Sequence, residues 1–274
     1  MSTAEVAPGV PVAPDGPGPI ETALRKARAD GRKLIVPYVT GGLGTDWLDV
    51  VRAVADAGAD AIEIGIPFSD PVMDGPVIQE ASDQALRAGA TPQSVLEALR
   101  HADAGVPLAV MTYYNICFRL GDHRFASSLV EAGVAGAILP DLPLEEAGPW
   151  CTEADEVGVE TILLAAPTAP DERLPRICAR SRGFVYSVGL LGITGERDQL
   201  ASSATVLARR LKAVTDKPVL IGVGVSNAEQ AVEACQVADG VVMGTSVVRR
   251  MLEGAGPTGV GAFIAEVRHA LDAG

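Results

Sequence analysis

Short apolar segments recur along this chain of 274 residues, and each is followed by a stretch with the spacing of an amphipathic helix. Apolar runs without polar alternation are typical of parallel strands covered on both faces, and parallel strands need crossover connections such as helices. Eight segments have this character: 33–40, 61–68, 107–113, 136–141, 160–167, 184–189, 218–224 and 240–245. Eight such units in about 250 residues predict a closed (β/α)8 barrel. An open doubly wound sheet is the alternative.

Two helix starts can be recognised from their caps. Thr91 precedes Pro92, which indicates an N-cap threonine with proline at the first helical position. Ser226 and Glu229 have the spacing of a capping box, which predicts a helix from there to about Ala238. We also expect an extra helix before the first strand.

The first nineteen residues differ in composition from the rest, with prolines at positions 8, 11, 14, 17 and 19 among small residues. Such a segment buries too little apolar surface to offset the entropy lost on ordering. We therefore predict a disordered extension over 1–19 and a single barrel domain over 20–274.

Charge and composition exclude several classes of protein. Asp and Glu number 35 against 22 Lys and Arg, a formal net charge of −13. This surface disfavours nucleic acids and anionic membranes, because binding to both relies on Lys and Arg. No apolar stretch reaches the roughly 18–20 residues of a membrane span, and the N-terminus lacks the features of a secretory signal, so we expect a cytoplasmic protein. Four cysteines and three histidines are dispersed without metal-ligand spacing, which predicts reduced thiols and no metal site.

Glu63 is the unusual residue of the predicted barrel interior. Side chains alternate along a strand, so Ile62, Ile64 and Ile66 share the face under the helices while Glu63 points inward. A buried carboxylate is costly unless its pKa rises or a partner compensates it. Its place near the strand end that leads into barrel active-site loops favours a general acid/base over a glutamate satisfied by interior polar groups.

Asp74 follows eleven residues later, in a loop that Pro67, Pro71 and Pro76 stiffen. This distance allows the loop to curl back over the strand end and to present Asp74 to Glu63. Two carboxylates in different environments can divide acid and base roles. An aspartate before glycine is also a common turn former, and that reading stays open.

Glycines follow the last three predicted strands, in segments 192–195, 222–226 and 244–246. Glycine lets backbone N–H groups approach a ligand closely, and the loops after strands seven and eight of barrels commonly bind phosphate with a helix N-terminus. The cluster predicts a phosphate site that relies on amides and not on a basic surface.

Further polar groups are expected at the same mouth. Tyr186 shares the inward alternation with Phe184 and either packs or takes part in the site. Segments 111–115 and 140–143 bring polar side chains to the ends of strands three and four.

Together these motifs resemble the tryptophan synthase alpha subunit family, which has a TIM barrel fold. The resemblance runs in order from about residue 20 to 254. It is carried by Glu63, by Gly-Ile-Pro-Phe-Ser-Asp-Pro at 65–71, by Asp-Gly-Pro at 74–76, and by segments 111–115, 140–143, 192–195 and 238–240.

The resemblance implies retro-aldol cleavage of indole-3-glycerol phosphate to indole and glyceraldehyde 3-phosphate. Glu63 matches the general acid/base that protonates indole C3 and then takes the hydroxyl proton. Asp74 matches the residue that accepts from indole N1–H, and Tyr186 corresponds to the active-site tyrosine beside Glu63.

The remaining matches concern the substrate and a partner. Thr194 matches the threonine of the mobile loop after strand six. The phosphate-binding positions match Gly195, Gly224, Gly244 and Thr245. Segments that face a beta subunit match Pro67, Asp70, Pro71 and Asp141. Pyridoxal phosphate would belong to that beta subunit, so we expect no cofactor in this chain.

Several positions depart from the family pattern. Segment 40–44 replaces a loop that usually contains Gly-Asp-Pro, Asn115-Ile116 stands for Asn-Pro, and Thr245 stands where serine is usual. None removes a catalytic group. The readings left open are a stand-alone indole-3-glycerol phosphate lyase, a weakly catalytic barrel that acts mainly as an allosteric partner of a beta subunit, and another phosphate-binding barrel such as a sugar-phosphate isomerase.

Overall fold

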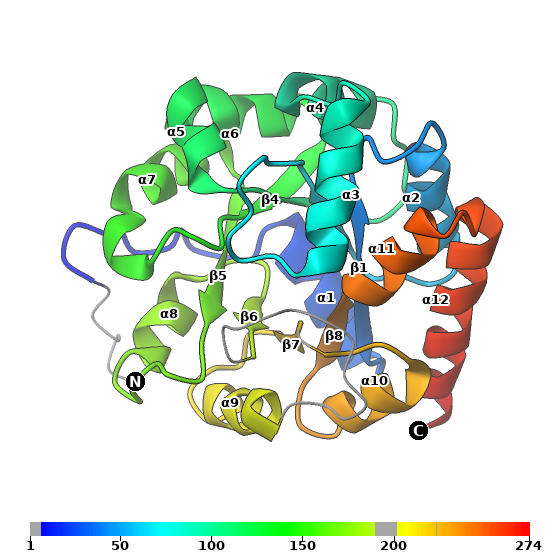
Figure 1. Cartoon of the computed structure of the whole chain (residues 1–274). Coiled ribbons are helices and arrows are strands. Elements are labelled where there is room, and N and C mark those ends of the chain that lie inside the picture. Colours follow the sequence, from blue (N-terminus) through cyan, green and yellow to red (C-terminus); the bar gives the residue numbers. More distant parts are fainter. Residues whose placement is uncertain (1–6, 190–201, 223) are drawn as a thin grey trace.

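Eight parallel strands close into a barrel in sequential order (Figure 1). The computed structural model describes residues 7–189, 202–222 and 224–274. The strands are β1 (Leu34–Thr40), β2 (Ile62–Gly65), β3 (Leu108–Met111), β4 (Val134–Ile138), β5 (Glu160–Ala165), β6 (Val185–Ser187), β7 (Val219–Ile221) and β8 (Gly240–Met243). β1 pairs with both β2 and β8, which closes the barrel. The predicted (β/α)8 barrel is confirmed, and the open sheet is excluded.

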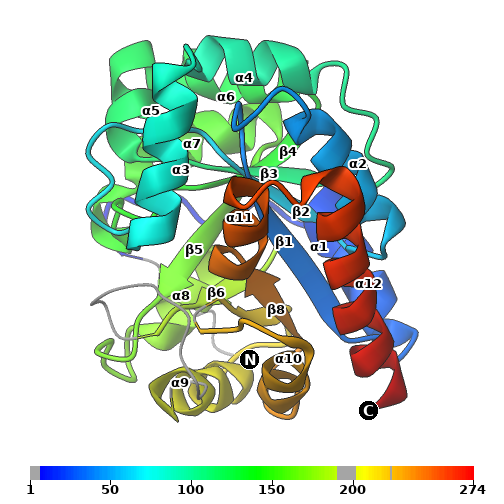
Figure 2. The same ribbon diagram turned by 45° about the vertical axis from the view of Figure 1, so that its right-hand side comes forward.

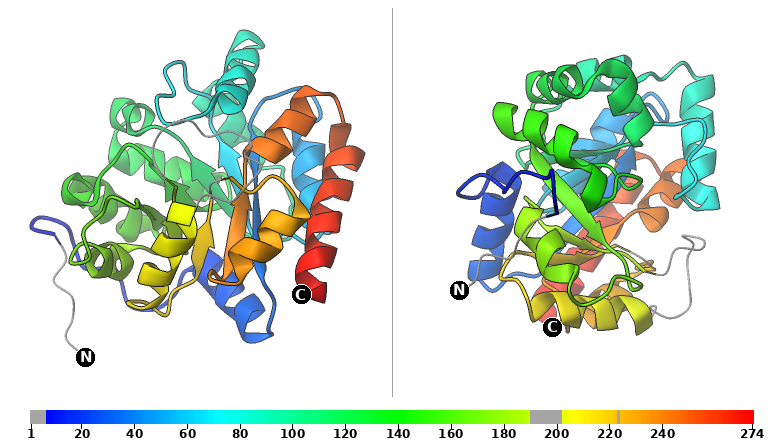
Figure 3. Two further views of the ribbon diagram at one scale, coloured as in Figure 1. Left: turned by 60° about the horizontal axis from the view of Figure 1, so that its bottom comes forward. Right: turned by 90° about the vertical axis from the view of Figure 1, so that its left-hand side faces the viewer.

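Helices surround the strands on all sides (Figures 2 and 3). They are α1 (Pro19–Ala29), α2 (Trp47–Asp56), α3 (Pro76–Arg87), α4 (Pro92–Leu99), α5 (Tyr114–Leu120), α6 (Asp122–Glu131), α7 (Gly148–Val157), α8 (Leu174–Arg180), α9 (Ser202–Lys212), α10 (Ala228–Cys235), α11 (Thr245–Leu252) and α12 (Gly256–Ala273), with a 3-10 turn η1 (Leu144–Glu146). None of these described helices is long and apolar enough to cross a membrane.

The buried residues form two layers, as the strand alternation predicts. Ile62, Ile64 and Ile66 belong to the layer between strands and helices. Ala61 belongs to the barrel interior, so Glu63 and Gly65 on the same face also turn inward. In register, Glu63 stands between Tyr38 of β1 and Ala109 of β3.

The extra helix α1 closes the end of the barrel at which the strands begin. Ile20 and Leu24 are fully buried in the interior cluster. The carboxylate of Glu160, the first residue of β5, accepts hydrogen bonds from the backbone N–H groups of Ile20 at 2.6 Å and Glu21 at 3.0 Å. These are N–H groups of the first helical turn, which have no partner inside the helix, so a side chain of the barrel caps α1.

Part of the N-terminal extension lies against the barrel. The disordered segment was predicted to span 1–19, and of it residues 7–19 are described. Pro19 is the first residue of α1, and residues 7–18 contain no helix or strand. The side chains of Ala7 and Val10 are buried. A Cβ atom at Gly148 would lie 2.2 Å from the carbonyl oxygen of Gly9, so the segment contacts the start of α7. The proline-rich composition therefore does not keep these residues away from the packed surface.

One of the two predicted helix caps is confirmed, and the other is displaced. Thr91 Oγ1 accepts from the Ser94 N–H and Ser94 Oγ accepts from the Thr91 N–H, which forms a capping box. The cap predicted at Ser226 is wrong by one residue: Asn227 Oδ1 accepts from the Gln230 N–H at 2.9 Å. The helix ends at Cys235 and not near Ala238, because the chain tightens into a turn in which the Gln236 N–H donates to the Glu233 carbonyl and the Val237 N–H donates to the Ala234 carbonyl.

Candidate active site

Glu63 occupies the inner face of β2 and is completely buried. Neither of its carboxylate oxygens has a hydrogen-bond partner within the described part of the chain. Burial raises the pKa of Glu63 to about 8, and the negative charge of Asp74 contributes in the same direction. Glu63 is therefore protonated at neutral pH and is able to donate a proton.

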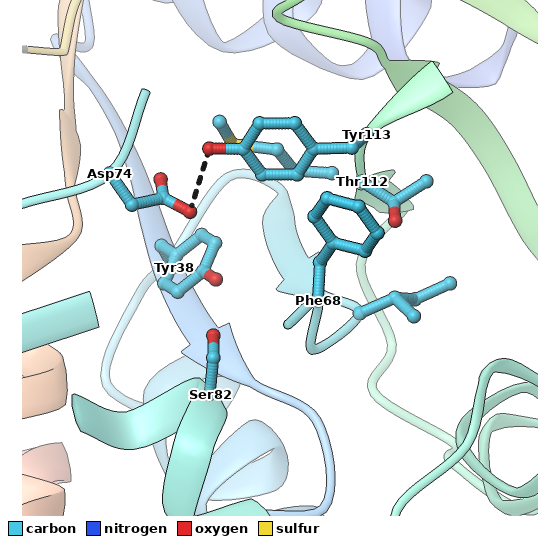
Figure 4. A pocket seen from close by; sticks show the side chains of 8 residues that line it. Tyr38, Phe68, Asp74, Ser82, Thr112 and Tyr113 are labelled. Atoms are coloured by element: carbon cyan, nitrogen blue, oxygen red, sulfur yellow. Dashed lines mark hydrogen bonds between the residues drawn. The ribbon is translucent and has the colours of Figure 1, made fainter. Parts of the chain in front are cut away.

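Asp74 comes from the loop between β2 and α3 and faces the barrel mouth (Figure 4). The loop turns tightly here, since the Asp74 N–H donates to the carbonyl of Pro71 at 3.1 Å. Burial raises the pKa of Asp74 to about 6, while a hydrogen bond from Tyr113 opposes this rise. At neutral pH Asp74 is ionised while Glu63 is neutral. Asp74 can therefore accept a hydrogen bond or stabilise a positive charge, and Glu63 can donate a proton.

Tyr113, at the end of β3, connects the loop to the barrel. Its hydroxyl donates to Asp74 Oδ2 and accepts from the Met73 N–H. Its ring stacks on Phe68 with the ring centroids 5.0 Å apart. The two contacts hold the loop over the strand ends, as the spacing of the two carboxylates predicts.

Tyr186 of β6 belongs to the interior cluster with Phe184. Burial raises its pKa well above the ordinary value, and the charge of Glu63 contributes in the same direction. A Cβ atom at Gly222 would lie 2.1 Å from the Tyr186 ring. Glycine at 222 therefore makes the room that Tyr186 occupies.

A pocket opens at this mouth and is drawn in Figure 4. It is lined by Tyr38, Ile66, Phe68, Asp74, Ser82, Met111, Thr112 and Tyr113. Asp74 reaches it, whereas Glu63 is enclosed beneath and does not line it. The two acids thus differ in solvent access as well as in pKa.

The predicted phosphate residues lie at the ends of β7 and β8. Gly244 is the N-cap of α11 and Thr245 its first residue, so the first N–H groups of the helix, which lack partners in a preceding turn, lie at this end of the barrel. Gly224 has a φ of +78°, which favours glycine. Ser246 Oγ donates to the carbonyl of Val225 at 3.4 Å, which joins the loop after β7 to the start of α11. Thr194 and Gly195 lie outside the described residues.

The residues predicted to face a partner surround the same mouth. Asp70 and Asp141 are exposed, Pro71 is partly exposed and Pro67 is buried. Asp141 Oδ1 accepts from the N–H of Tyr114, the first residue of α5, at 2.8 Å. Asp70 Oδ2 accepts from Ser69 Oγ at 2.6 Å. Asp141 therefore also caps a helix, a role that its sequence position did not indicate.

Two tyrosines of the site were not singled out from the sequence. Tyr38 lies in the apolar strand segment 33–40, where an aromatic residue looks like ordinary packing. The sequence signal that could have identified Tyr38 is the strand alternation, which places it on the same inward face as Thr40, two residues later. Tyr113 was expected at the mouth only as part of segment 111–115, because nothing in the sequence predicts a hydrogen bond to Asp74.

A group of potential metal ligands exists away from the pocket in the described chain. One potential ligand atom from each of His123 of α6 and Glu153 and Glu156 of α7 lies within 4.8 Å of the other two. A hydrogen bond of 2.9 Å between His123 Nδ1 and Glu153 Oε2 already pairs two of them. We assign no metal to this group.

Comparison with known proteins agrees with this geometry. Residues 24–262 match the family model of the tryptophan synthase alpha chain. The chain is 44% identical to the tryptophan synthase alpha chain of Streptomyces coelicolor over 256 residues, which cover 90% of this chain and 94% of the relative. It is 46% identical to that of Thermobifida fusca, with coverage of 84% and 87%.

Solved structures give the same result. Mycobacterium tuberculosis tryptophan synthase superposes with a TM-score of 0.87 at 36% identity, covering 93% of this chain and 99% of that one. The tryptophan synthase alpha chain of Legionella pneumophila superposes with a TM-score of 0.84 at 31% identity, with coverage of 94% and 98%. This chain therefore belongs to the tryptophan synthase alpha chain family.

Proposed function

We propose that this chain cleaves indole-3-glycerol phosphate to indole and glyceraldehyde 3-phosphate by a retro-aldol reaction. The observation that carries the proposal is the pair of acids at the barrel mouth. Glu63, with a pKa of about 8, is neutral at pH 7, whereas Asp74, with a pKa of about 6, is ionised. The cleavage needs a proton donor for indole C3 and a hydrogen-bond acceptor for indole N1–H, both present at the same pH.

The protons and electrons of the reaction balance with these two groups. Glu63 gives its proton to indole C3, and the positive indolenine that forms is stabilised by ionised Asp74 at N1–H. The Glu63 carboxylate then takes the proton of the hydroxyl on the adjacent glycerol carbon. The bond between C3 and that carbon breaks, its electron pair returns to the indole ring, and an aldehyde forms. Glu63 ends protonated, ready for another turnover.

The remaining residues bind and orient the substrate in this proposal. The phosphate lies at the start of α11, where the N–H groups of Gly244 and Thr245 and the loop of Gly224 face it. Thr194 and Gly195 are assigned to the same task from the sequence. Tyr186 belongs to the interior cluster, and in this proposal it limits the positions that the indole can take.

A tryptophan synthase beta subunit is the proposed partner, and its pyridoxal phosphate would consume the indole. The surface around the mouth supports this, since Val72 in the β2–α3 loop is 81% exposed and Phe118 of α5 is 69% exposed. Large exposed apolar side chains beside a site mark interaction surfaces. Asp70, Pro71 and Asp141 belong to the same rim, whereas Pro67 is buried and supports the loop from within, so it is not part of the surface that a partner would contact.

The proposal is tested by incubating the purified chain with indole-3-glycerol phosphate, with and without a beta subunit, and measuring indole. Indole formation that the beta subunit stimulates is the expected result. Indole formation that ignores the beta subunit indicates a stand-alone lyase. Stimulation of beta activity without indole formation indicates a mainly allosteric role, and the absence of both effects rejects the proposal.

A further inference from the structure

Tyr38 of β1 is a buried phenol for which the mechanism above has no task. It stands opposite Glu63 in the register of β1 and β2, and it is 8% exposed. A Cβ atom at Gly65 would lie 1.7 Å from the Tyr38 hydroxyl oxygen. The phenol therefore crosses the end of β2 directly over Gly65, two residues beyond Glu63, and only glycine leaves that space.

The Tyr38 hydroxyl lies inside the pocket. Figure 4 shows the ring beneath Asp74, with the hydroxyl in the space bounded by Asp74, Phe68 and Ser82. The titratable groups that face it come from four elements: Glu63 of β2, Asp74 of the following loop, Tyr113 at the end of β3, and Tyr186 of β6. Thr40, on β1 itself, adds a neighbouring hydroxyl.

This environment keeps the proton on Tyr38. Burial is the main cause that raises the pKa of Tyr38 well above its ordinary value, and the negative charges of Asp74 and Glu63 follow, while the Thr40 hydroxyl acts in the opposite direction. A phenol that stays protonated next to two acids can donate a hydrogen bond to an ionised carboxylate.

The two acids have few hydrogen-bond donors. Both oxygens of Glu63 are without a partner within the described residues, and Tyr113 is the side-chain donor that Asp74 has. During the reaction the negative charge is on Asp74 first and then also on Glu63, after Glu63 has protonated indole C3. A buried charge without a donor is costly, so the ionised Glu63 needs one.

We propose that Tyr38 is a positioning residue of the acid pair, whose hydroxyl donates a hydrogen bond to the carboxylate that carries the negative charge at each stage of turnover. The inference rests on the proposed function. The hydroxyl keeps its own proton throughout. Because Glu63 accepts no hydrogen bond within the described residues, the hydroxyl reaches that carboxylate through small side-chain movements when Glu63 becomes ionised. Its effect is to stabilise both carboxylates in their ionised forms.

Tyr38→Phe tests this role, because it removes the hydroxyl and keeps the ring that packs over Gly65. We expect kcat for indole formation to fall roughly tenfold, since hydrogen bonds to charged groups contribute about that factor or more. KM should stay within about twofold, since the hydroxyl acts on the charge that develops. Both limbs of the pH profile of kcat should move to higher pH by up to about one unit.

Tyr114→Phe is the matched control. Its hydroxyl donates to Asp122 Oδ2 at 3.1 Å, away from the residues that line the pocket. We expect its kcat and its pH limits to equal those of the wild type. Thermal unfolding of both variants shows whether either substitution disturbs the fold.

A second measurement does not depend on turnover. Infrared difference titration follows the carboxylic acid band of Glu63, assigned by its loss in Glu63→Gln, and gives the pKa of Glu63 in the wild type and in Tyr38→Phe. A higher pKa in the variant supports the role of Tyr38, and an equal pKa overturns it. If the wild type forms indole and Tyr38→Phe has the same kcat and pH profile, the role of Tyr38 is overturned but the proposed function is not. A wild type that forms no indole overturns the proposed function as well.

Discussion

The hydroxyl of Tyr113 donates a hydrogen bond to Asp74 Oδ2 at 3.2 Å, and it accepts one from the Met73 N–H at 2.9 Å. One phenol thus holds both the β2–α3 loop and the carboxylate that the loop carries. The bond favours the ionised form of Asp74, but burial is the larger influence and leaves its pKa at about 6.

Tyr113→Phe should move the acidic limb of the pH profile upward. Without the donor, the ionised form of Asp74 loses stabilisation, so its pKa rises and activity near pH 6 falls by roughly tenfold. The ring still stacks on Phe68, so thermal unfolding should change little. Measuring kcat from pH 5 to 9 checks this, and an unmoved acidic limb would contradict it.

Glu63→Gln should retain the fold and lose nearly all indole formation. Positioned acid/base groups typically contribute about 10²- to 10⁴-fold in rate, and glutamine has no acidic proton. Single-turnover assays with indole-3-glycerol phosphate measure the loss. Turnover like that of the wild type would reject the role of Glu63.

The same variant should gain stability relative to the wild type as pH rises. The folded-state pKa of Glu63, about 8, is above its ordinary value of 4.5, so the folded chain binds more protons than the unfolded chain between these limits. The free energy of unfolding of the wild type therefore decreases over that window. We expect the Tm of Glu63→Gln minus that of the wild type to increase from pH 4.5 to pH 8. A difference that is constant with pH would show that Glu63 is not buried as a neutral acid.

The wild-type chain should have a bell-shaped pH profile of kcat. Activity rises as Asp74 ionises near pH 6 and falls as Glu63 loses its proton near pH 8. We specify kcat at saturating substrate because the substrate phosphate titrates near pH 6 and affects binding. A profile that is flat from pH 5 to 9 would be inconsistent with this acid pair.

Gly222→Ala should displace Tyr186. The added methyl group would lie 2.1 Å from the ring, and overpacking of this kind typically costs about 1–3 kcal/mol of stability. Chemical denaturation measures the cost, and indole assays measure the lost activity. The double variant Gly222→Ala/Tyr186→Leu has room for the methyl group, so it should recover stability without recovering activity.

Sulfate should compete with the substrate. The N–H groups at the start of α11 bind a tetrahedral anion whether or not it carries the indole. Gly244→Asp should weaken the competition more than about tenfold, because a carboxylate there repels the anion. Position 244 accepts a side chain without a close contact, as its Cβ would lie 3.8 Å from the nearest atom, so unfolding measurements should find the variant folded.

Much of the architecture could be predicted because it depends on local pattern. The apolar runs gave all eight strands, and the period of two placed Glu63 inside and Ile62, Ile64 and Ile66 outside. Predicted strands were longer than the observed ones, since apolar residues continue into loops that also pack. The cap at Asn227 was missed because Ser226 next to it is an equally good cap by residue type.

The hydrogen bonds of the site could not be predicted in this way. Tyr113 meets Asp74 across 39 positions of sequence, and Asp141 caps α5 across 27. Such contacts depend on where the folded chain brings distant segments together. Tyr38 and Gly65 illustrate this further, since neither residue type alone indicates a phenol crossing the end of β2.

The position of α1 determines at which end of the barrel substrate can enter and product can leave. With Ile20 and Leu24 filling one end and Glu160 holding the helix there, the described residues close that end of the barrel to reactants and products. We therefore expect substrate to enter and indole to leave at the opposite end, where Asp74 lines the pocket. A protein that covers this mouth would control the access of substrate and receive the indole, and it would do so without contacting Glu63.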